Sequence, residues 1–64
     1  MGIVKVIEVI AQSEISFDDA AKQAVAGASK SIRNIYSVYV KDMKCHVNDG
    51  KISTYGVICK VSLE

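Results

Sequence analysis

The first predicted β-strand is apolar on both of its faces, and this constrains the fold more than any other feature. Residues 3–11 read IVKVIEVIA, a run rich in β-branched side chains that precedes a polar break at residues 12–14. Successive side chains of a strand point to opposite sides of a sheet. One face carries Val4, Val6, Glu8 and Ile10. The other face carries Ile3, Lys5, Ile7 and Val9. Both faces therefore need cover, from a helix or from another subunit.

A chain this short has few residues with which to cover both faces of the strand. Its 64 residues predict a single domain over residues 1–64. Domains of this size bury only about 60% of the surface of the unfolded chain, so they usually need disulfides, a metal or self-association for stability. Cys45 and Cys59 are too few for a disulfide scaffold, and no signal-peptide pattern precedes them. We therefore expect the protein to be stabilised by self-association.

Charge and hydropathy argue against several classes of partner. The formal net charge is +1, which gives no attraction to nucleic acid or to anionic lipid. No apolar run approaches the ~20 residues that a membrane-spanning helix needs. We therefore expect a cytoplasmic protein with no nucleic-acid partner and no membrane partner.

A helix is predicted after the first strand. Ser16 is a suitable N-cap, and Asp18 and Asp19 follow in the first turn, where the helix dipole favours carboxylates. Apolar side chains then recur at helical spacing at Phe17, Ala21, Ala24, Ala28, Ile32 and Ile35. This face is built largely of alanine, so the helix can approach its packing partner closely. Asn34 is the predicted C-cap.

Two further strands complete the predicted fold. Residues 36–47 and 52–63 alternate in polarity, and the Asp49-Gly50 pair between them is a strong hairpin signal. The predicted core face of the last strand is Tyr55, Val57, Cys59, Val61 and Leu63. The expected fold class is α+β, with the order β-α-β-β and a three-stranded antiparallel sheet packed around one helix. Such a sheet has free edges, which again invite partner subunits.

No catalytic constellation is evident, and we expect a protein that is not an enzyme. Cys45 and His46 could supply a thiol nucleophile and its base, but adjacent strand residues point to opposite faces. A partly exposed structural histidine is the simpler interpretation, and an enzyme that uses either residue is kept as an alternative. The hairpin register places Cys45 opposite about residue 53 and Cys59 opposite about residue 39, too far apart for a disulfide.

Carboxylates and tyrosines offer candidate ligand contacts, but ordinary structural roles also explain them. Asp42 and Asp49 lie near or on the hairpin and carry the oxygen ligands that calcium prefers, although their spacing is not that of an EF-hand. Turn formation by itself accounts for Asn48 and Asp49. The tyrosines could stack a flat ligand or could simply be good strand formers.

Together these segments resemble the dodecin family over about residues 3–64. The break that ends in Gln12-Ser13 and the helix entry SFDDAA at residues 16–21 resemble the first half of that family's chain. The segment DGKISTYGVICKVSLE resembles its closing strand, with matches at Gly50, Ile52, Tyr55, Val57, Cys59 and Val61. The resemblance implies a sheet that wraps around the helix, and twelve copies that form a hollow dodecameric shell of cubic symmetry.

The resemblance also implies a ligand. Flavin-binding dodecins hold riboflavin or FMN in pairs between subunits, for storage and quenching rather than catalysis. In that family a tryptophan of the second strand stacks on the flavin ring, and a glutamine of the third strand bonds to its polar edge. Alignment on the HVNDG hairpin places these positions at Ser37 and Gly56 of this chain. Tyr39, on the same face as Ser37, is the side chain that could stack instead.

Two hypotheses about function follow from this departure. The first is a homo-oligomeric binding and storage shell with weak or no flavin affinity. Each lost stacking contact is worth about 1–3 kcal/mol, and with the lost amide hydrogen bonds the affinity falls about a hundredfold or more. The second is a calcium-binding or purely structural shell, similar to dodecin relatives that also lack the tryptophan. In this second hypothesis, carboxylates near Asp42 and Asp49 meet across a symmetry axis.

Overall fold

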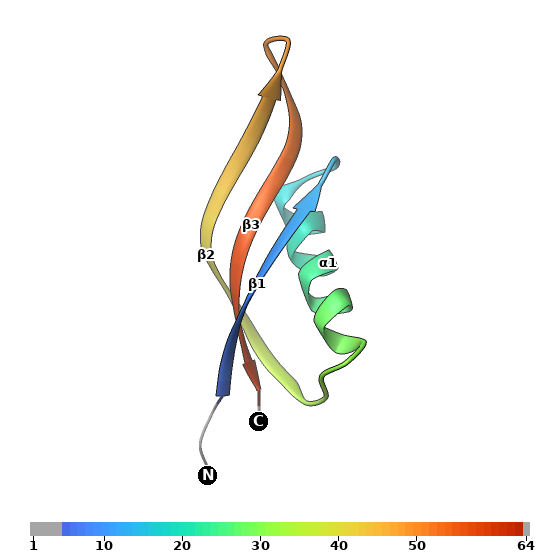
Figure 1. Cartoon of the computed structure of the whole chain (residues 1–64), viewed down its shortest axis with the longest axis vertical. Helices are drawn as coiled ribbons and strands as arrows, with labels where there is room; N and C mark the ends of the chain where they lie inside the picture. Colours follow the sequence, from blue (N-terminus) through green and yellow to red (C-terminus); the bar gives the residue numbers. More distant parts are fainter. Residues whose placement is uncertain (1–4, 64) are drawn as a thin grey trace.

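The computed structural model describes residues 5–63, which form three strands and one helix. The elements are β1 (Lys5–Ser13), α1 (Phe17–Ser29), β2 (Ile35–Asn48) and β3 (Lys51–Leu63). The strands form one antiparallel sheet in the order β1-β3-β2, with α1 beside it (Figure 1). The predicted fold class and element order are confirmed. Residues 3 and 4 of the predicted first strand lie outside the described residues.

The first strand extends further than its polarity predicts. β1 continues through Gln12 and Ser13, which pair with Gly56 and Tyr55 of β3, so the predicted break at residue 12 is wrong. Strand pairing uses backbone groups, so the ladder with β3 can continue through both positions regardless of their side chains. The Ser13 hydroxyl is buried, and it donates to Asp19 Oδ2 at 2.6 Å and accepts from the Ile15 backbone N–H at 2.9 Å.

The helix begins where predicted but ends earlier. Ser16 is the N-cap, and its hydroxyl accepts from the backbone N–H of Asp19 at 3.0 Å. α1 ends at Ser29, with Lys30 in the C-cap position. The prediction of Asn34 as C-cap is therefore wrong. Asn34 has a φ of 61° and lies in the connection to β2, where a left-handed residue is needed and asparagine tolerates that conformation.

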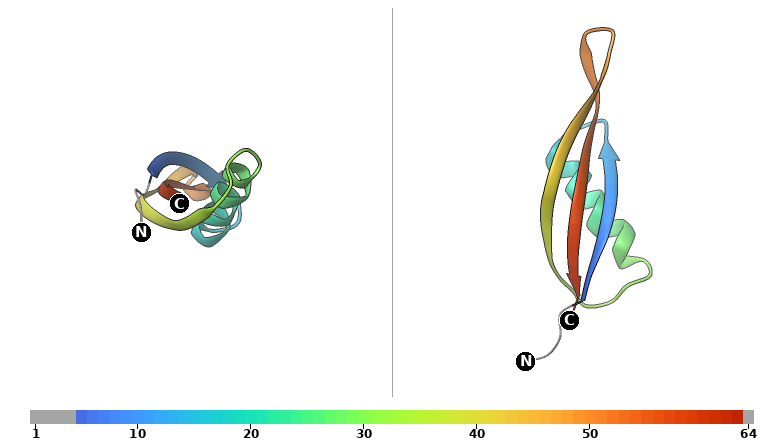
Figure 2. Two further views of the ribbon diagram at one scale, coloured as in Figure 1. Left: turned by 90° about the horizontal axis from the view of Figure 1, so that it is seen from below. Right: turned by 60° about the vertical axis from the view of Figure 1, so that its left-hand side comes forward.

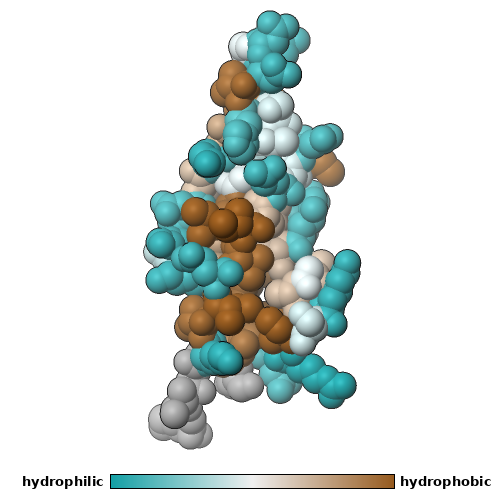
Figure 3. All heavy atoms as spheres, in the orientation of Figure 1, coloured by the Kyte–Doolittle hydropathy of each residue, from teal (hydrophilic) through white to brown (hydrophobic). Residues whose placement is uncertain are grey.

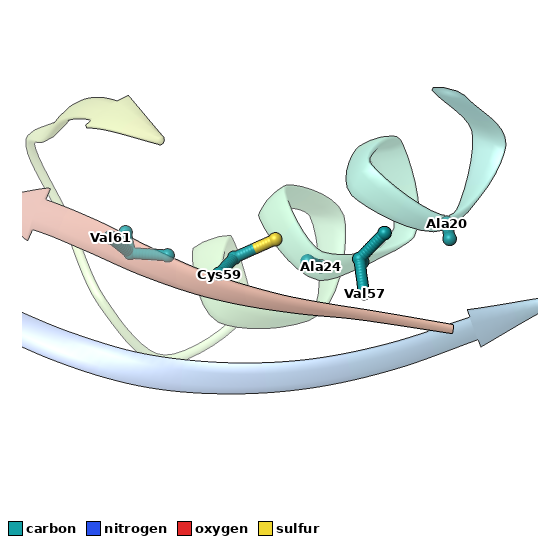
Figure 4. Packing of buried hydrophobic residues seen from close by; sticks show 5 residues of the cluster. All are labelled: Ala20, Ala24, Val57, Cys59 and Val61. Carbon is teal, nitrogen blue, oxygen red and sulfur yellow. The ribbon is translucent and has the colours of Figure 1, made fainter. Parts of the chain in front are cut away.

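A narrow core joins α1 to β3. The buried residues of α1 are Ala20, Ala24 and Ala28, spaced four residues apart. The prediction that Ala21 lies on this buried face is wrong, because Ala20 occupies it instead. Figure 4 shows the facing residues of β3, which are Val57, Cys59 and Val61. All three are at most 2% exposed, which confirms the predicted core face of β3. Small helix side chains allow this close approach, because a larger side chain would hold α1 away from the sheet.

A bulge in β2 changes the direction of its side chains. Val40 pairs with Cys59 and Asp42 pairs with Ile58, so Lys41 is an extra residue between them. Strict alternation from Val40 would turn Asp42 toward α1. The bulge instead places Asp42 on the side of the sheet that faces away from α1, beside Ile58.

That side of the sheet, the outer face, has no cover within the chain. Figure 2 shows α1 on one side of the strands only. Val6, Ile10 and Tyr39 of the outer face are 51%, 69% and 65% exposed. Figure 3 shows apolar side chains gathered over the strands in the middle and lower part of the view. The second apolar face predicted for the first strand is therefore exposed in the single chain.

The molecule is elongated for its length. Its extents are 49 × 20 × 13 Å and its radius of gyration is 13.1 Å, whereas a compact chain of this length has a radius of about 11 Å. Its accessible surface of 4864 Å² is roughly a fifth larger than the ~4,000 Å² expected for a compact 6.9 kDa monomer. Much of the length comes from the β2–β3 hairpin, which projects beyond β1 and α1 (Figure 1).

Candidate ligand-binding face

The outer face presents side chains from all three strands in register. β3 is central, so each of its outward residues has a neighbour on β1 and another on β2 as long as β1 continues. Read from β1 across to β2, the rows are Ile10–Ile58–Asp42, then Gln12–Gly56–Lys44, then Thr54–His46. Apolar and polar groups from segments far apart in the sequence therefore lie next to one another.

These rows line a pocket of about 370 Å³. Ile10 and Ile58 supply apolar side chains, the backbone at Gly56 lies in the next row, and polar side chains complete the lining. The rim residues are Gln12, Asp42, Lys44 and His46. Pockets that bind small molecules usually have about 300–1,000 Å³ and combine an apolar lining with a few polar groups. The pocket fits that description at the small end of the range.

Gly56 keeps the middle of the pocket open. A Cβ atom at this position would lie 3.4 Å from the Lys44 carbonyl oxygen and 3.9 Å from the Ala11 carbonyl oxygen. It would also lie 3.9 Å from Cγ of Gln12. Because Gly56 has no side chain, the neighbouring side chain of Gln12 forms this part of the pocket surface.

The charged and polar groups of the outer face are only lightly constrained. His46 Nδ1 and Thr54 Oγ1, on the paired strands of the hairpin, are 2.9 Å apart in an exposed contact. Lys41 Nζ lies 3.4 Å from Glu8 Oε2, with the two side chains 45% and 51% exposed. An ion pair this exposed contributes little to stability. These groups therefore remain available to a ligand or to a partner surface.

The three predicted flavin-site residues share the outer face but are far apart along it. Ser37 pairs with Ser62 and Tyr39 with Lys60, while Gly56 lies nearer the hairpin. Gly56 and Ser62 are six positions apart on β3, which is about 20 Å at ~3.4 Å per position. One chain cannot bring Ser37 and Gly56 to the same ring, so a site that uses both would need two copies.

The side chains at these positions do not fit a stacked flavin well. Serine has no aromatic surface at position 37, and the residues that line the pocket over Gly56 include no phenylalanine, tyrosine or tryptophan. Tyr39 is 65% exposed on the outer face, so its ring is free to contact a ligand. Stacking on this chain would therefore depend on Tyr39.

The two predicted calcium ligands are also separated. Asp42 lines the pocket, whereas Asp49 lies in the hairpin turn with a φ of 55°, next to Gly50 with a φ of 75°. Seven residues of β2 and its turn separate them, about 24 Å along an extended chain. Within residues 5–63 no group of three His, Cys, Asp or Glu side chains is placed to hold a metal. A site that uses both carboxylates would again need two copies.

The thiols and the imidazole do not form a reactive pair within the chain. Cys45 pairs with Tyr55 and His46 with Thr54, so their side chains leave opposite sides of the sheet. Cys59 is fully buried against α1, and this burial raises the pKa of its thiol. Both cysteines are free, and their partners in the register, Tyr55 and Val40, are far apart on the hairpin.

Of the nine residues that line the pocket, only Asp42 and Gly56 were predicted as site residues from the sequence. The Asp49-Gly50 turn alone does not place Lys44 next to Gly56, because the register of β2 with β3 shifts between His46 and Val47, so that Cys45 pairs with Tyr55 and not with the predicted residue 53. Ile10 and Gln12 depend on which residues of β1 pair with β3, and no local signal specifies that pairing. The polarity of Gln12 suggested the end of a strand rather than a ligand contact.

Comparison with known proteins identifies the architecture. A family model described as Dodecin matches residues 3–64. The dodecin of Streptomyces coelicolor is 26% identical, with a TM-score of 0.91 over 95% of this chain and 87% of that chain. A Thermus thermophilus dodecin, at 24% identity, has the same fold, with a TM-score of 0.91 over 95% of this chain and 91% of that one.

A third solved structure is more similar in sequence. It is the calcium dodecin of Mycobacterium tuberculosis, described as a calcium-chelating immunodominant antigen with a novel calcium-binding site. It is 34% identical, with a TM-score of 0.85 over 98% of this chain and 90% of that chain. No curated protein matches the chain significantly. Among residues 5–63, no helix is long and apolar enough to cross a membrane.

Proposed function

Because the chain belongs to the dodecin family, we propose that it forms a homo-oligomeric shell of twelve copies that binds and stores a small ligand without catalysing a reaction. One observation carries this proposal. The outer face of the sheet is apolar at Val6, Ile10 and Ile58, and α1 lies on the opposite side. Neighbouring copies would bury this surface in the shell.

The size of the exposed surface supports assembly. The excess over a compact monomer is roughly 900 Å², and each partner in a standard protein interface buries about 800 Å². The projecting two-stranded part of the hairpin also favours assembly, because an isolated pair of strands is marginally stable in water. Contacts with other copies would stabilise both regions.

For the ligand, we propose a flavin affinity much lower than that of relatives with a stacking tryptophan. Ser37 and Gly56 supply neither an aromatic ring nor an amide, and Tyr39 is the remaining candidate for a stacking contact. Loss of the stacking contacts together with the amide hydrogen bonds lowers affinity about a hundredfold or more.

Sedimentation velocity and riboflavin titration test the two parts of this proposal separately. We expect a single species near twelve times the chain mass, with weak quenching of riboflavin fluorescence. A Tyr39→Ala variant should remove the residual quenching, whereas Tyr36→Ala is the matched control. Sedimentation as a monomer would contradict the shell. Strong quenching at sub-micromolar wild-type protein would contradict the lowered flavin affinity.

Calcium is the second candidate ligand, favoured by the 34% identity to a protein described as a calcium dodecin. Asp42 and Asp49 are too far apart within one chain, so we propose that carboxylates of different copies would share the ion. Thermal melts with and without millimolar calcium test this. A higher melting temperature that is lost in Asp42→Asn or Asp49→Asn would support it, and an unchanged melt of the wild type would count against it.

A further inference from the structure

The side of β2 that faces α1 is apolar along the length of the strand. Its residues, identified by the β3 residues with which they pair, are Ile35, Val38, Val40, Met43, Cys45 and Val47. The bulge at Ser53 keeps Val47 and its partner Ile52 on that side. The opposite side of β2 carries Ser37, Tyr39, Asp42, Lys44 and His46. A strand divided in this way normally has its apolar side buried.

Within the chain, α1 leaves much of that apolar side uncovered. The helix packs mainly on β1 and β3, and β2 is the edge strand farther from it (Figure 1). A groove of about 440 Å³ lies between α1 and β2, and its apolar lining includes Val25, Val38 and Val40. Farther along β2, Met43 and Val47 are 62% and 66% exposed. We call the row Val38, Val40, Met43, Cys45 and Val47 the β2 stripe.

The dimensions of the β2 stripe fit a polypeptide rather than a small molecule. Val38 and Val47 are nine positions apart, which is about 30 Å at ~3.4 Å per position. As an edge strand, β2 also has a row of backbone groups without a strand partner among residues 5–63. The stripe contains no charged side chain, so an identical copy can approach it without electrostatic repulsion.

A closed shell needs two different kinds of contact. One self-complementary contact joins only two copies, and one head-to-tail contact gives a ring or a filament. The outer face supplies the first surface, with Val6 and Ile10 exposed on it. The β2 stripe lies on the other side of the sheet, so it can be buried by a different neighbour at the same time.

We propose that the β2 stripe is a second contact surface, against which another copy of this chain packs. The inference rests on the proposed function in one respect, because its partner is another copy of the chain. The outer face or the stripe by itself would hold a smaller assembly, and the two together close the shell.

Sedimentation velocity of charged variants tests this. Met43→Asp places a carboxylate in the stripe, and Val47→Asp does the same in the projecting hairpin, outside the core. We expect each variant to sediment as an assembly smaller than the wild type but larger than one chain, because the outer face is intact. The double variant Ile10→Asp/Met43→Asp should be a monomer. Ile15→Asp, at a side chain 73% exposed before α1, is the matched control and should sediment like the wild type.

The two free thiols supply a second measurement on the same samples. Cys45 lies in the stripe, whereas Cys59 is fully buried in the core of the single chain. Iodoacetamide should label Cys45 at least tenfold more slowly in the wild type than in Met43→Asp, because the neighbouring copy covers it. Continued protection of Cys59 in both proteins shows that the variant is folded, and equal labelling rates of Cys45 in two folded proteins would contradict the inference.

The outcomes separate this inference from the proposed shell. If Met43→Asp and Val47→Asp both sediment like a dodecameric wild type, the stripe is not a contact surface, and the shell stands. A wild type that forms only pairs or triplets, which these variants dissociate, would support the stripe and contradict the shell of twelve. A monomeric wild type would contradict both.

Discussion

Both faces of this sheet carry apolar side chains, although the outer face is the more polar of the two, and only one face is covered within the chain. Toward α1, Val57, Cys59 and Val61 are at most 2% exposed, while on the outer face Val6 and Ile10 are more than half exposed. The difference arises because a chain of 64 residues supplies one helix for two apolar faces. The covered face stabilises the fold of one copy, and the outer face is available for other copies and for ligands. Substitutions on the two faces should therefore have different consequences.

The largest effect is expected from a charge on the outer face. Ile10→Asp would place a carboxylate in an interface that excludes water, which costs several kcal/mol when the charge has no partner. We expect the variant to sediment as small species while its circular dichroism remains that of a folded chain. Ile15→Asp is the matched control, because Ile15 is 73% exposed in the loop before α1. If Ile10→Asp sediments like the wild type, the outer face is not an interface.

The next largest effect is expected from overpacking the covered face. Ala24 is 2% exposed between α1 and β3, so Ala24→Leu would push the helix away from the sheet. Overpacking of this kind costs about 1–3 kcal/mol, measured as a lower midpoint of chemical unfolding. Ala26→Leu on the exposed side of α1 should change the free energy of unfolding by less than about 0.5 kcal/mol. Equal midpoints for the two variants would contradict the described core.

A smaller effect is expected where β1 joins α1. The buried Ser13 hydroxyl bonds to Asp19 and to the backbone N–H of Ile15, so Ser13→Ala should cost about 1–2 kcal/mol of unfolding free energy. The hydrogen bonds from Ser13 and then from Gln23 lower the pKa of Asp19. Because this pKa is lower in the folded state, its contribution is complete above the unfolded value of about 4 and is lost as pH falls below it.

Acid titration of stability checks this linkage. Wild type and Asp19→Asn should differ near neutral pH and converge as the pH falls below about 4. Asp18→Asn is the matched control, since Asp18 lies in the same helical turn and is exposed. A difference between wild type and Asp19→Asn that persists at low pH would contradict a role for the charged form of Asp19.

The smallest effect is expected from the exposed ion pair of the outer face. Removal of the Lys41–Glu8 contact in Lys41→Ala should change stability by less than about 1 kcal/mol, because both side chains are about half exposed. A larger loss, seen as a clear shift in the unfolding midpoint, would mean that this pair is buried between copies.

The sequence predicted the elements better than their relative placement. Polarity alternation, the Ser16 cap and the Asp49-Gly50 turn are local signals, and each predicted element was found. The end of β1 was misplaced because pairing with β3 accommodates the polar residues Gln12 and Ser13. The end of α1 was misplaced because the apolar spacing continues to Ile35, beyond the last helical residue.

The candidate site was harder to predict, since it depends on pairing between distant segments. Gly56 was identified from the family resemblance, but its neighbour Gln12 becomes visible only from the β1–β3 register. Asp42 joined the pocket through the bulge at Lys41, which sequence alternation does not reveal. Whether Ser37, Tyr39, Gly56, Asp42 and Asp49 bind flavin or calcium stays a prediction about the assembled protein.

A native mass spectrum of the untagged protein tests the central claim most directly, namely that copies of this chain cover the outer face. We predict one dominant assembly near 83 kDa, twelve times the chain mass of 6.9 kDa, with any retained ligand visible as added mass. A spectrum dominated by the single chain at micromolar concentration would contradict that claim.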